Sequence, residues 1–453
     1  MSGIHGVLRF DGSAVAERDL VRQANALAHR GSDRSGRWSD GSVGVGHLLL
    51  RVTREDLLDA QPLREGATVL VADLRLDNRE ALASEMEIDP EPLSDAAILA
   101  KAYGRWGEDC VEHLVGDFAF AIWDKSARAL ILARDHMGQR HLHYHAGKNL
   151  FAFASEIGGL RVLAEVPYDL SIAAVARRLA MDRSPSGGAT FFDGIFGLEG
   201  GSVMRVSATG AITTRRFWQP RADPKHLGRD EAYYVRAYRE TLAEAVACRV
   251  RRARQPPALL LGGGFDSGAI AGLAGPKKLL AVASVGMDET RGVRKWAAAL
   301  ARHLPYLEPI LVTREGIDVL TDLDRNFLAT GEPFSPNRYV MDALTAAAAS
   351  RGARVLMDGH GGDYTLNPRG TGWLLRRLKR GQIAPFLREF AAFRRHNRVT
   401  WINAFKTEIA APGFPGVAGL WRRLRAGLPS KNAAASLTPA LLAEAGLPGG
   451  TLA

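Results

Sequence analysis

The chain has 453 residues, of which 46% are hydrophobic, and a formal net charge of +10. This length predicts two or three domains, and the apolar fraction is sufficient for full cores. Two cysteines, Cys110 and Cys248, exclude a disulfide framework and a cysteine-based metal site, which favours a reducing compartment. Neither a signal-peptide pattern nor an apolar run of roughly 18 residues is present. We therefore expect a cytoplasmic protein with no membrane partner.

The N-terminal part, up to about residue 205, has short apolar runs separated by turn residues such as Asp11-Gly12 and Asp40-Gly41. The expected strands are Gly3–Phe10, Ser42–Leu50, Thr68–Val71, Phe118–Trp123, Ala129–Ala133, Leu150–Ala154 and Ser202–Val206, and the expected helices are Asp19–Leu27 and Asp95–Trp106. This pattern predicts an α+β sandwich of two sheets between helices.

A linker is expected at Pro220–Pro224. From Asp230 the pattern alternates between helix and strand, with expected strands at 258–261, 279–285, 309–312 and 354–357. Such alternation predicts a doubly wound parallel sheet. After Gly370 the pattern is helical.

The basic excess is concentrated between Arg369 and Arg425, which hold thirteen basic residues and two acids, Glu389 and Glu408. A solvated helix surface accounts for this. The functional alternative is a surface for an acidic peptide, a partner protein or nucleotide phosphates. No nucleic-acid-binding motif accompanies the charge, so nucleic acid is not an expected partner.

A glycine-rich loop follows the expected strand at 258–261. It has the sequence Gly262-Gly263-Gly264-Phe265-Asp266-Ser267 and precedes a helical pattern. Such a loop lets backbone N–H groups approach a phosphate, and the helix N-terminus adds positive potential. Asp266 would repel the phosphate unless Mg²⁺ bridges them. The loop therefore predicts a nucleotide and a metal, although a plain strand-to-helix turn has the same composition.

A second strand, Arg354–Met357, ends in a similar turn, Asp358-Gly359-His360-Gly361-Gly362-Asp363. If the two strands are parallel, both acidic loops lie on the carboxyl edge of one sheet, where open α/β sheets bind ligands.

Several blocks of the chain resemble the asparagine synthetase family, in the family's order. In the N-terminal half these are Met1–Gly6, His29–Asp33, Gly46-His47, Gln61–Leu63, Trp106–Cys110, Gly116–Asp124, Ala133–Gly138 and Phe153–Ile157. In the C-terminal half they are Gly262–Ser267, Asp288-Glu289 and Gly359–Asp363.

The resemblance implies a glutamine amidotransferase-like domain of the Ntn-hydrolase type over residues 1–218. An ATP pyrophosphatase-type domain with a helical C-terminal region would follow over 225–453, short at its end. The implied reaction is adenylation of a carboxylate by ATP and capture of the acyl-adenylate by an amine, giving AMP and pyrophosphate. Asp266 and Asp363 would bind Mg²⁺. The residues implied to cradle the phosphates are Gly262, Gly263, Gly264, Ser267, Gly359, Gly361 and Gly362.

The N-terminal half departs from the family's glutaminase. The family uses a cysteine that becomes N-terminal when Met1 is removed, and here that position is Ser2, which can also act as a nucleophile. The glutamine-binding arginine falls near Leu48-Leu49, and Asp73-Leu74 replaces the oxyanion-binding Asn-Gly. An aspartate there repels an oxyanion. We therefore expect a catalytically inactive domain that serves as a scaffold or as a substrate-positioning surface.

The ATP-domain half departs as well. His360 stands where asparagine synthetases have a glutamate, which argues against ammonia as the nucleophile. The second loop, together with Asp73–Asn78, resembles the branch of lasso-peptide cyclases and lactam synthetases. His360 would orient the acyl-adenylate or act as a general base, or it caps the loop structurally. Gly262 replaces the family's serine, which predicts weaker ATP binding.

Other expected roles rest on position alone. Lys379 or Lys406 would take the place of a late family lysine that stabilises the α-phosphate. Ser335 and Asn337 would contact the substrate, or Asn337 would only cap a helix that begins after prolines.

Three hypotheses remain. The first is an ATP-dependent ligase that closes a macrolactam on a peptide or amino-acid carboxylate, with precursor-peptide-processing proteins as partners. The second is an asparagine synthetase, and the third is a truncated pseudoenzyme that binds nucleotide or a partner.

Overall fold

The computed structural model describes residues 1–179, 187–275, 277–285, 292–313, 315–331, 337–362 and 373–410. The chain forms two compact units, Met1–Ser171 with Ser184–Asp358, and Ile172–Arg183 with Gly359–Ala453. Both cysteines are free. None of the helices in the described ranges is long and apolar enough to cross a membrane.

The N-terminal part of the first unit has two six-stranded sheets. The first runs in the order β10 (Phe196–Gly197), β8 (His143–Ala146), β9 (Leu150–Ala154), β1 (Gly3–Arg9), β3 (Val43–Leu49) and β2 (Arg34–Asp40). The second runs β12 (Ile212–Arg216), β11 (Ser202–Ser207), β7 (Ala129–Arg134), β6 (Gly116–Asp124), β5 (Thr68–Leu76) and β4 (Leu63–Glu65). All strand pairs in both sheets are antiparallel.

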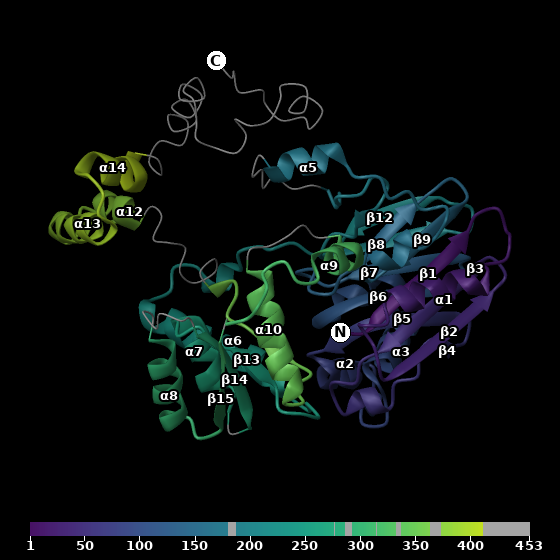
Figure 1. The fold of residues 1–453 in the computed structure, drawn as a ribbon, viewed down its shortest axis with the longest axis horizontal. Helices are drawn as coiled ribbons and strands as arrows, with labels where there is room; N and C mark the ends of the chain where they lie inside the picture. Colours follow the sequence, from purple (N-terminus) through teal and green to yellow (C-terminus); the bar gives the residue numbers. More distant parts are fainter. Residues whose placement is uncertain are drawn as a thin grey trace, which may run out of the picture. The chain divides into compact units, whose positions relative to one another are not determined.

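Strand β5 shows how the layers are built. Val69 and Val71 pack between the two sheets, whereas Leu70 and Ala72 face the core under helices α2 (Arg79–Glu85) and α3 (Asp95–Trp106). Successive side chains of a strand point to opposite faces, so a strand with a core on both sides is apolar throughout. Helices α1 (Glu17–Ala26) and α4 (Gly158–Arg161) cover the outer face of the first sheet. The predicted sandwich of two sheets between helices is confirmed (Figure 1).

The second part of the first unit has four parallel strands in the order β15 (Leu307–Thr313), β14 (Leu279–Val285), β13 (Ala258–Leu260) and β16 (Leu356–Met357). One face packs on α6 (Glu231–Val250), α7 (Phe265–Leu273) and α8 (Val293–His303). The opposite face packs on α10 (Arg338–Ser350). Another helix, α9 (Leu323–Thr330), precedes α10. Helices on both faces confirm the doubly wound sheet (Figure 1).

The second unit contains α5 (Ile172–Leu179), α12 (Trp373–Lys379), α13 (Ile383–Asn397) and α14 (Trp401–Phe405), followed by a π turn, Lys406–Ala410. The predicted helical region is confirmed as far as residue 410. Residues 411–453 lie outside the described ranges.

The last turn of α6 and the residues that follow it join the two parts of the first unit. The Arg249 guanidinium pairs with Asp77 and lies 2.9 Å from an Asp117 carboxylate oxygen. Arg75 lies 2.9 Å from Asp77 on the same side. Backbone bonds continue the junction, since the Arg254 N–H donates to the Val52 carbonyl at 3.0 Å.

Two further arginines of this segment bind carboxylates of the N-terminal part. Arg252 lies 3.0 Å from Glu55 and 2.9 Å from Glu91, and Arg251 pairs with Glu80. The run of basic residues at 249–254 is therefore an internal clamp and not a free surface.

Replacing Arg249 with alanine is expected to lower the free energy of unfolding by about 1–3 kcal/mol, because two half-buried carboxylates, Asp77 and Asp117, then keep Arg75 but lose the second cation beside them. Urea unfolding followed by tryptophan fluorescence measures the change. The matched control is Arg215→Ala, which removes an equally bidentate but exposed pair with Asp109 and Glu112 and should cost under about 1 kcal/mol. Equal losses in the two variants would contradict the clamp.

Candidate active site

The glycine loop lies at the carboxyl end of β13. Gly263 has φ +77, a left-handed conformation that side chains rarely adopt. Gly264 is the N-cap of α7 and has extended backbone (φ −87, ψ 168) with no side chain to cap the helix. The first N–H groups of α7 consequently have no capping side chain, which is the arrangement that favours an anion at a helix N-terminus.

Asp266 lies in the first turn of α7, and not in the loop where the sequence pattern placed it. It is half-buried, and burial together with the Asp266 charge raises the pKa of Tyr238. Ser267 is buried, and its hydroxyl donates to the Gly264 carbonyl at 3.4 Å. The loop, Asp266 and Ser267 thus form one connected group at the start of the helix.

The second loop begins on a neighbouring strand. Leu356 and Met357 of β16 pair in parallel with Ala258 and Leu259 of β13, so the two strands end at the same sheet edge, as predicted. Asp358 follows directly in the first unit.

The remaining predicted residues fall in several places. Gly359, His360, Gly361 and Gly362 belong to the second unit, where His360 is exposed and Gly361 has φ +95. Asn337 is the N-cap residue of α10, but its side chain makes no capping bond. Lys379 and Lys406 are exposed. Asp363, Ser335 and Asp288-Glu289 lie outside the described residues, so their roles stay predictions.

A magnesium ion fits the donors at the first loop. Within the described ranges no group of three or more His, Cys, Asp or Glu side chains could hold a metal. Mg²⁺ bound with a nucleotide needs only one or two protein carboxylates, because phosphate and water oxygens complete its shell. The half-buried carboxylate of Asp266, beside a helix N-terminus, meets that need.

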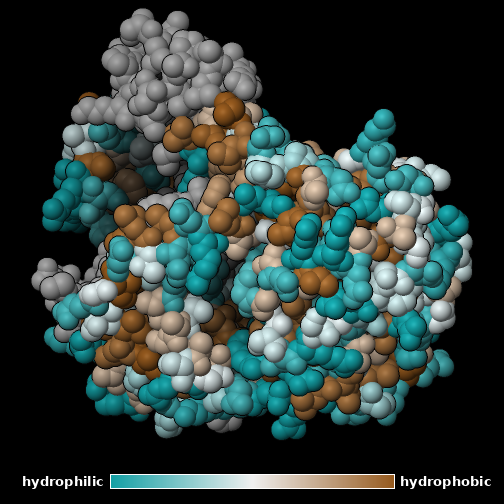
Figure 2. Space-filling view, turned by 45° about the vertical axis from the view of Figure 1, so that its right-hand side comes forward, coloured by the Kyte–Doolittle hydropathy of each residue, from teal (hydrophilic) through white to brown (hydrophobic). Residues whose placement is uncertain are grey.

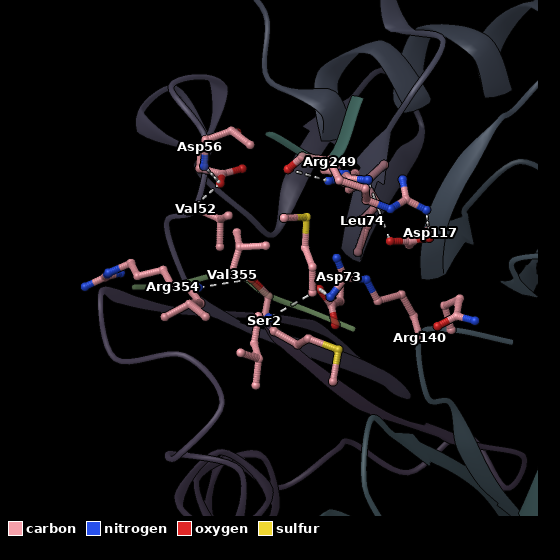
Figure 3. Close-up of a pocket in the computed structure, with 18 of the residues that line it drawn as sticks. Ser2, Val52, Asp56, Asp73, Leu74, Asp117, Arg140, Arg249, Arg354 and Val355 are labelled. Carbon is pink, nitrogen blue, oxygen red and sulfur yellow. Dashed lines mark hydrogen bonds and ion pairs between the residues drawn. The ribbon is translucent and has the colours of Figure 1, made fainter. Parts of the chain in front are cut away.

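The N-terminal site is filled by Asp73, on β5 (Figure 3). The Ser2 N–H donates to Asp73 at 3.2 Å, and the Ser2 hydroxyl accepts from the Leu50 N–H at 3.1 Å. Arg30 and Arg140 lie 3.2 and 3.4 Å from the two carboxylate oxygens of Asp73, which is 3% exposed.

The same cluster extends to Glu156. Arg30 donates to Glu156 at 2.6 Å and to the Ser2 carbonyl at 2.9 Å. Burial raises the pKa of Glu156, but hydrogen bonds from His29 and Arg30 and the charge of Arg30 lower it to about 2. Leu48 and Leu49, where the family binds glutamine, are buried apolar residues of β3. Charged groups that could bind a substrate are therefore paired with one another.

A cavity of about 470 Å³ lies between this cluster and the parallel sheet (Figure 3). Its N-terminal wall includes Ser2, Asp73, Arg75, Asp117 and Arg140, and its other wall includes Val246, Arg249, Ile270 and Val355–Asp358. The filled N-terminal site and the carboxyl edge of β16 thus border one polar space.

Sequence reasoning did not find Arg140, Arg249 and Asp117 as members of this site. Arg249 and Asp117 are 132 positions apart in the chain, so no local motif joins them. The one local signal for a charged site was the sequence Arg75-Leu76-Asp77, in which charged and apolar residues alternate along a strand.

The two halves of the chain match two families. Residues 1–218 match the glutamine amidotransferase domain family, and residues 237–435 match the asparagine synthase family. An amidase, chry2, of Gibberella zeae is 30% identical over 59% of this chain and 40% of its own length. Asparagine synthetase [glutamine-hydrolyzing] 3 of Bacillus subtilis is 29% identical over 60% of this chain and 45% of its own length. The chain spans less than half of each of these two relatives.

Fold and site together define a chain with an amidotransferase-type sandwich followed by a parallel-sheet domain with a phosphate-type loop. The chain belongs to the asparagine synthetase family. Among solved structures, a glutamine phosphoribosylpyrophosphate amidotransferase of Bacillus subtilis shares 14% identity over 79% of this chain and 80% of its own, with a TM-score of 0.36.

Replacing Gly263 with alanine is expected to weaken ATP binding about tenfold, because a side chain at this φ costs about 1–2 kcal/mol. Titration calorimetry with a non-hydrolysable ATP analogue measures the change. Gly262→Ser is the control, since an added Cβ at Gly262 meets no atom within 4 Å. It restores the family's hydroxyl and should bind the nucleotide at least as tightly as the native chain. Unchanged affinity in Gly263→Ala would contradict a phosphate-binding role.

Replacing Asp73 with asparagine is expected to lower the free energy of unfolding by about 2–4 kcal/mol, because Arg30 and Arg140 lose a buried counter-charge. Asp40→Asn is the control, since Asp40 pairs with Lys125 at 2.8 Å on the surface and should change stability by less than about 1 kcal/mol. Urea unfolding of both variants tests the cluster, and similar losses would show that Asp73 has no special structural role.

Proposed function

We propose that this chain is an ATP-dependent carbon–nitrogen ligase that adenylates a carboxylate and closes a macrolactam within a peptide substrate, without hydrolysing glutamine. The observation that carries the proposal is the pairing of Asp73 with the Ser2 N–H, Arg30 and Arg140. It occupies the glutaminase position of a chain that keeps its ATP-type loop.

An N-terminal nucleophile needs its own α-amine, unprotonated, as the general base. If Met1 is removed, the nitrogen that faces Asp73 at 3.2 Å becomes that amine, and the carboxylate favours its protonated form. The same negative charge opposes an oxyanion at this place. The site is therefore unsuited to release ammonia from glutamine, and the amine must come from another source.

An amine on the substrate itself meets this requirement. A carboxylate oxygen attacks the α-phosphorus of ATP, the bond to pyrophosphate breaks, and an acyl-adenylate forms. The amine then attacks the acyl carbon, AMP leaves with the bonding electrons, and the amine gives up a proton. When carboxylate and amine belong to one peptide, the product is a lactam that weighs one water less.

The residues of the chain suit these steps. The loop at Gly262–Gly264 and the N-terminus of α7 would hold the phosphates, and Asp266 would hold Mg²⁺, which neutralises charge on the leaving pyrophosphate. His360 would accept the proton of the amine. Precursor-peptide-processing proteins would deliver the substrate.

Asparagine formation from aspartate and free ammonia is the second candidate. It is favoured by the similarity to asparagine synthetases of Bacillus subtilis and Methanocaldococcus jannaschii, the latter 25% identical over 60% of this chain.

The deciding measurement is pyrophosphate release with Mg-ATP, aspartate and ammonium. We expect ATP binding without asparagine formation, because His360 stands where asparagine synthetases have a glutamate. Turnover that forms asparagine and disappears in Asp266→Ala would replace the lactam proposal with the second candidate.

Candidate precursor peptides then provide the positive test. We expect AMP, pyrophosphate and a peptide lighter by one water, all lost in Asp266→Ala. ATP binding with no AMP from any acid or peptide would instead indicate a nucleotide-binding protein without ligase activity.

A further inference from the structure

An apolar stripe is exposed along helix α13 in the second unit. Ile383 and Leu387 lie one turn apart on this helix and are 51% and 58% exposed. Two neighbouring large aliphatic side chains are seldom this exposed together. Phe390 continues the stripe one turn later but is buried, because the ring of Trp401 on α14 lies 5.5 Å from it. The stripe therefore runs from Ile383 to the edge of Trp401.

Helix α14 extends this surface. Trp401, Ile402 and Phe405 are 52%, 66% and 51% exposed. The Arg394 guanidinium lies 4.7 Å from the Trp401 ring centre and so holds the ring against α13. Five large apolar side chains are thus presented on two packed helices, α13 and α14 (Figure 1).

The surroundings of the stripe are strongly positive. Exposed basic side chains on residues 373–410 are Arg376, Lys379, Arg380, Arg388, Arg395, Arg398 and Lys406. Of the two acids in this range, Glu389 lies 2.7 Å from Arg377 and 3.9 Å from Arg388, and Glu408 is buried with a raised pKa. Within this range, no carboxylate is exposed.

Helical geometry places two of these cations beside the stripe. Arg388 and Arg395 are seven residues apart on α13 and so lie on one side of the helix, and Arg388 directly follows Leu387 of the stripe. They therefore form a positive edge parallel to the apolar row. A ligand that matches both the apolar row and the positive edge must carry apolar side chains about one helical turn apart, with carboxylates beside them.

We propose that the surface formed by Ile383, Leu387, Trp401, Ile402 and Phe405, with its basic edge, is a docking site for an acidic amphipathic peptide segment. Charge complementarity selects this occupant, because residues 373–410 offer several exposed cations and no exposed carboxylate. This binding does not require ATP and is separate from the proposed ligase reaction.

The test is fluorescence anisotropy with a labelled synthetic helix-forming peptide that carries leucines and glutamates on adjacent faces, titrated with the full chain without ATP. Leu387→Ser should weaken binding about tenfold, since one buried leucine contact is lost. Arg388→Gln and Arg395→Gln should weaken it by about threefold each and reduce its sensitivity to salt.

Two controls match these variants. Leu227→Ser removes an exposed leucine (64%) of the first unit, and Arg302→Gln removes an exposed arginine of α8, and both should leave binding unchanged. Because the altered side chains are exposed, far-UV circular dichroism should be the same for all variants.

A peptide with glutamine in place of glutamate should bind at least tenfold more weakly if the charge edge acts as proposed. Failure of the acidic peptide to bind, or equal weakening in Leu227→Ser and Leu387→Ser, overturns the proposal. Co-sedimentation with vesicles of phosphatidylcholine and phosphatidylglycerol that is lost in Leu387→Ser, without peptide binding, also overturns it and makes the surface a membrane contact.

Discussion

The first unit depends on one arrangement of charge, the guanidinium of Arg249 between the carboxylates of Asp77 and Asp117. Arg249 lies in the last turn of α6, which packs against the parallel sheet. Both carboxylates belong to the N-terminal sandwich, where Asp77 follows β5 and Asp117 lies at the start of β6. Two half-buried carboxylates so close together are unfavourable without a cation, and a lone guanidinium is equally unfavourable. Arg75 of the sandwich lies 2.9 Å from Asp77 and 3.9 Å from Asp117, and Arg249 adds a second cation from α6, which links the loop-bearing sheet to the sandwich.

The same arrangement gives the N-terminal sandwich a structural role beside the parallel sheet. Asp73 and Arg75 stand two residues apart on β5, and so point to the same face. Asp73 pairs with Arg30 and Arg140, and Arg75 lies beside the clamp of Arg249. A single strand thus carries both a buried charge cluster and part of the junction, and removing the domain would expose the wall of the 470 Å³ cavity next to Asp358.

The architecture could be predicted from sequence because hydrophobic periodicity reports burial directly. Strand β14 and helix α3 begin and end as expected. Strand β5 was expected to stop at Val71 but continues to Leu76, because ion pairs with distant residues bury Asp73 and Arg75. Strand β2 was not expected, since its residues are mostly exposed and it is held by backbone pairing to β3. Contacts between residues more than a hundred positions apart leave no local periodicity, so charged partners were the part of the site that could not be foreseen.

The basic residues behind the net charge of +10 have different surroundings in the two units. In the first unit, arginines such as Arg30, Arg249 and Arg252 are held by carboxylates and contribute to folding. In the second unit, Arg395 and Arg398 are exposed, and the two acids nearby are paired or buried. Basic residues thus have different consequences in the two units. Paired cations stabilise an internal junction, whereas cations without exposed acidic neighbours create a field that reaches solvent over about a Debye length. The positive field of this chain therefore reaches solvent on α13 and α14, where exposed apolar side chains also gather.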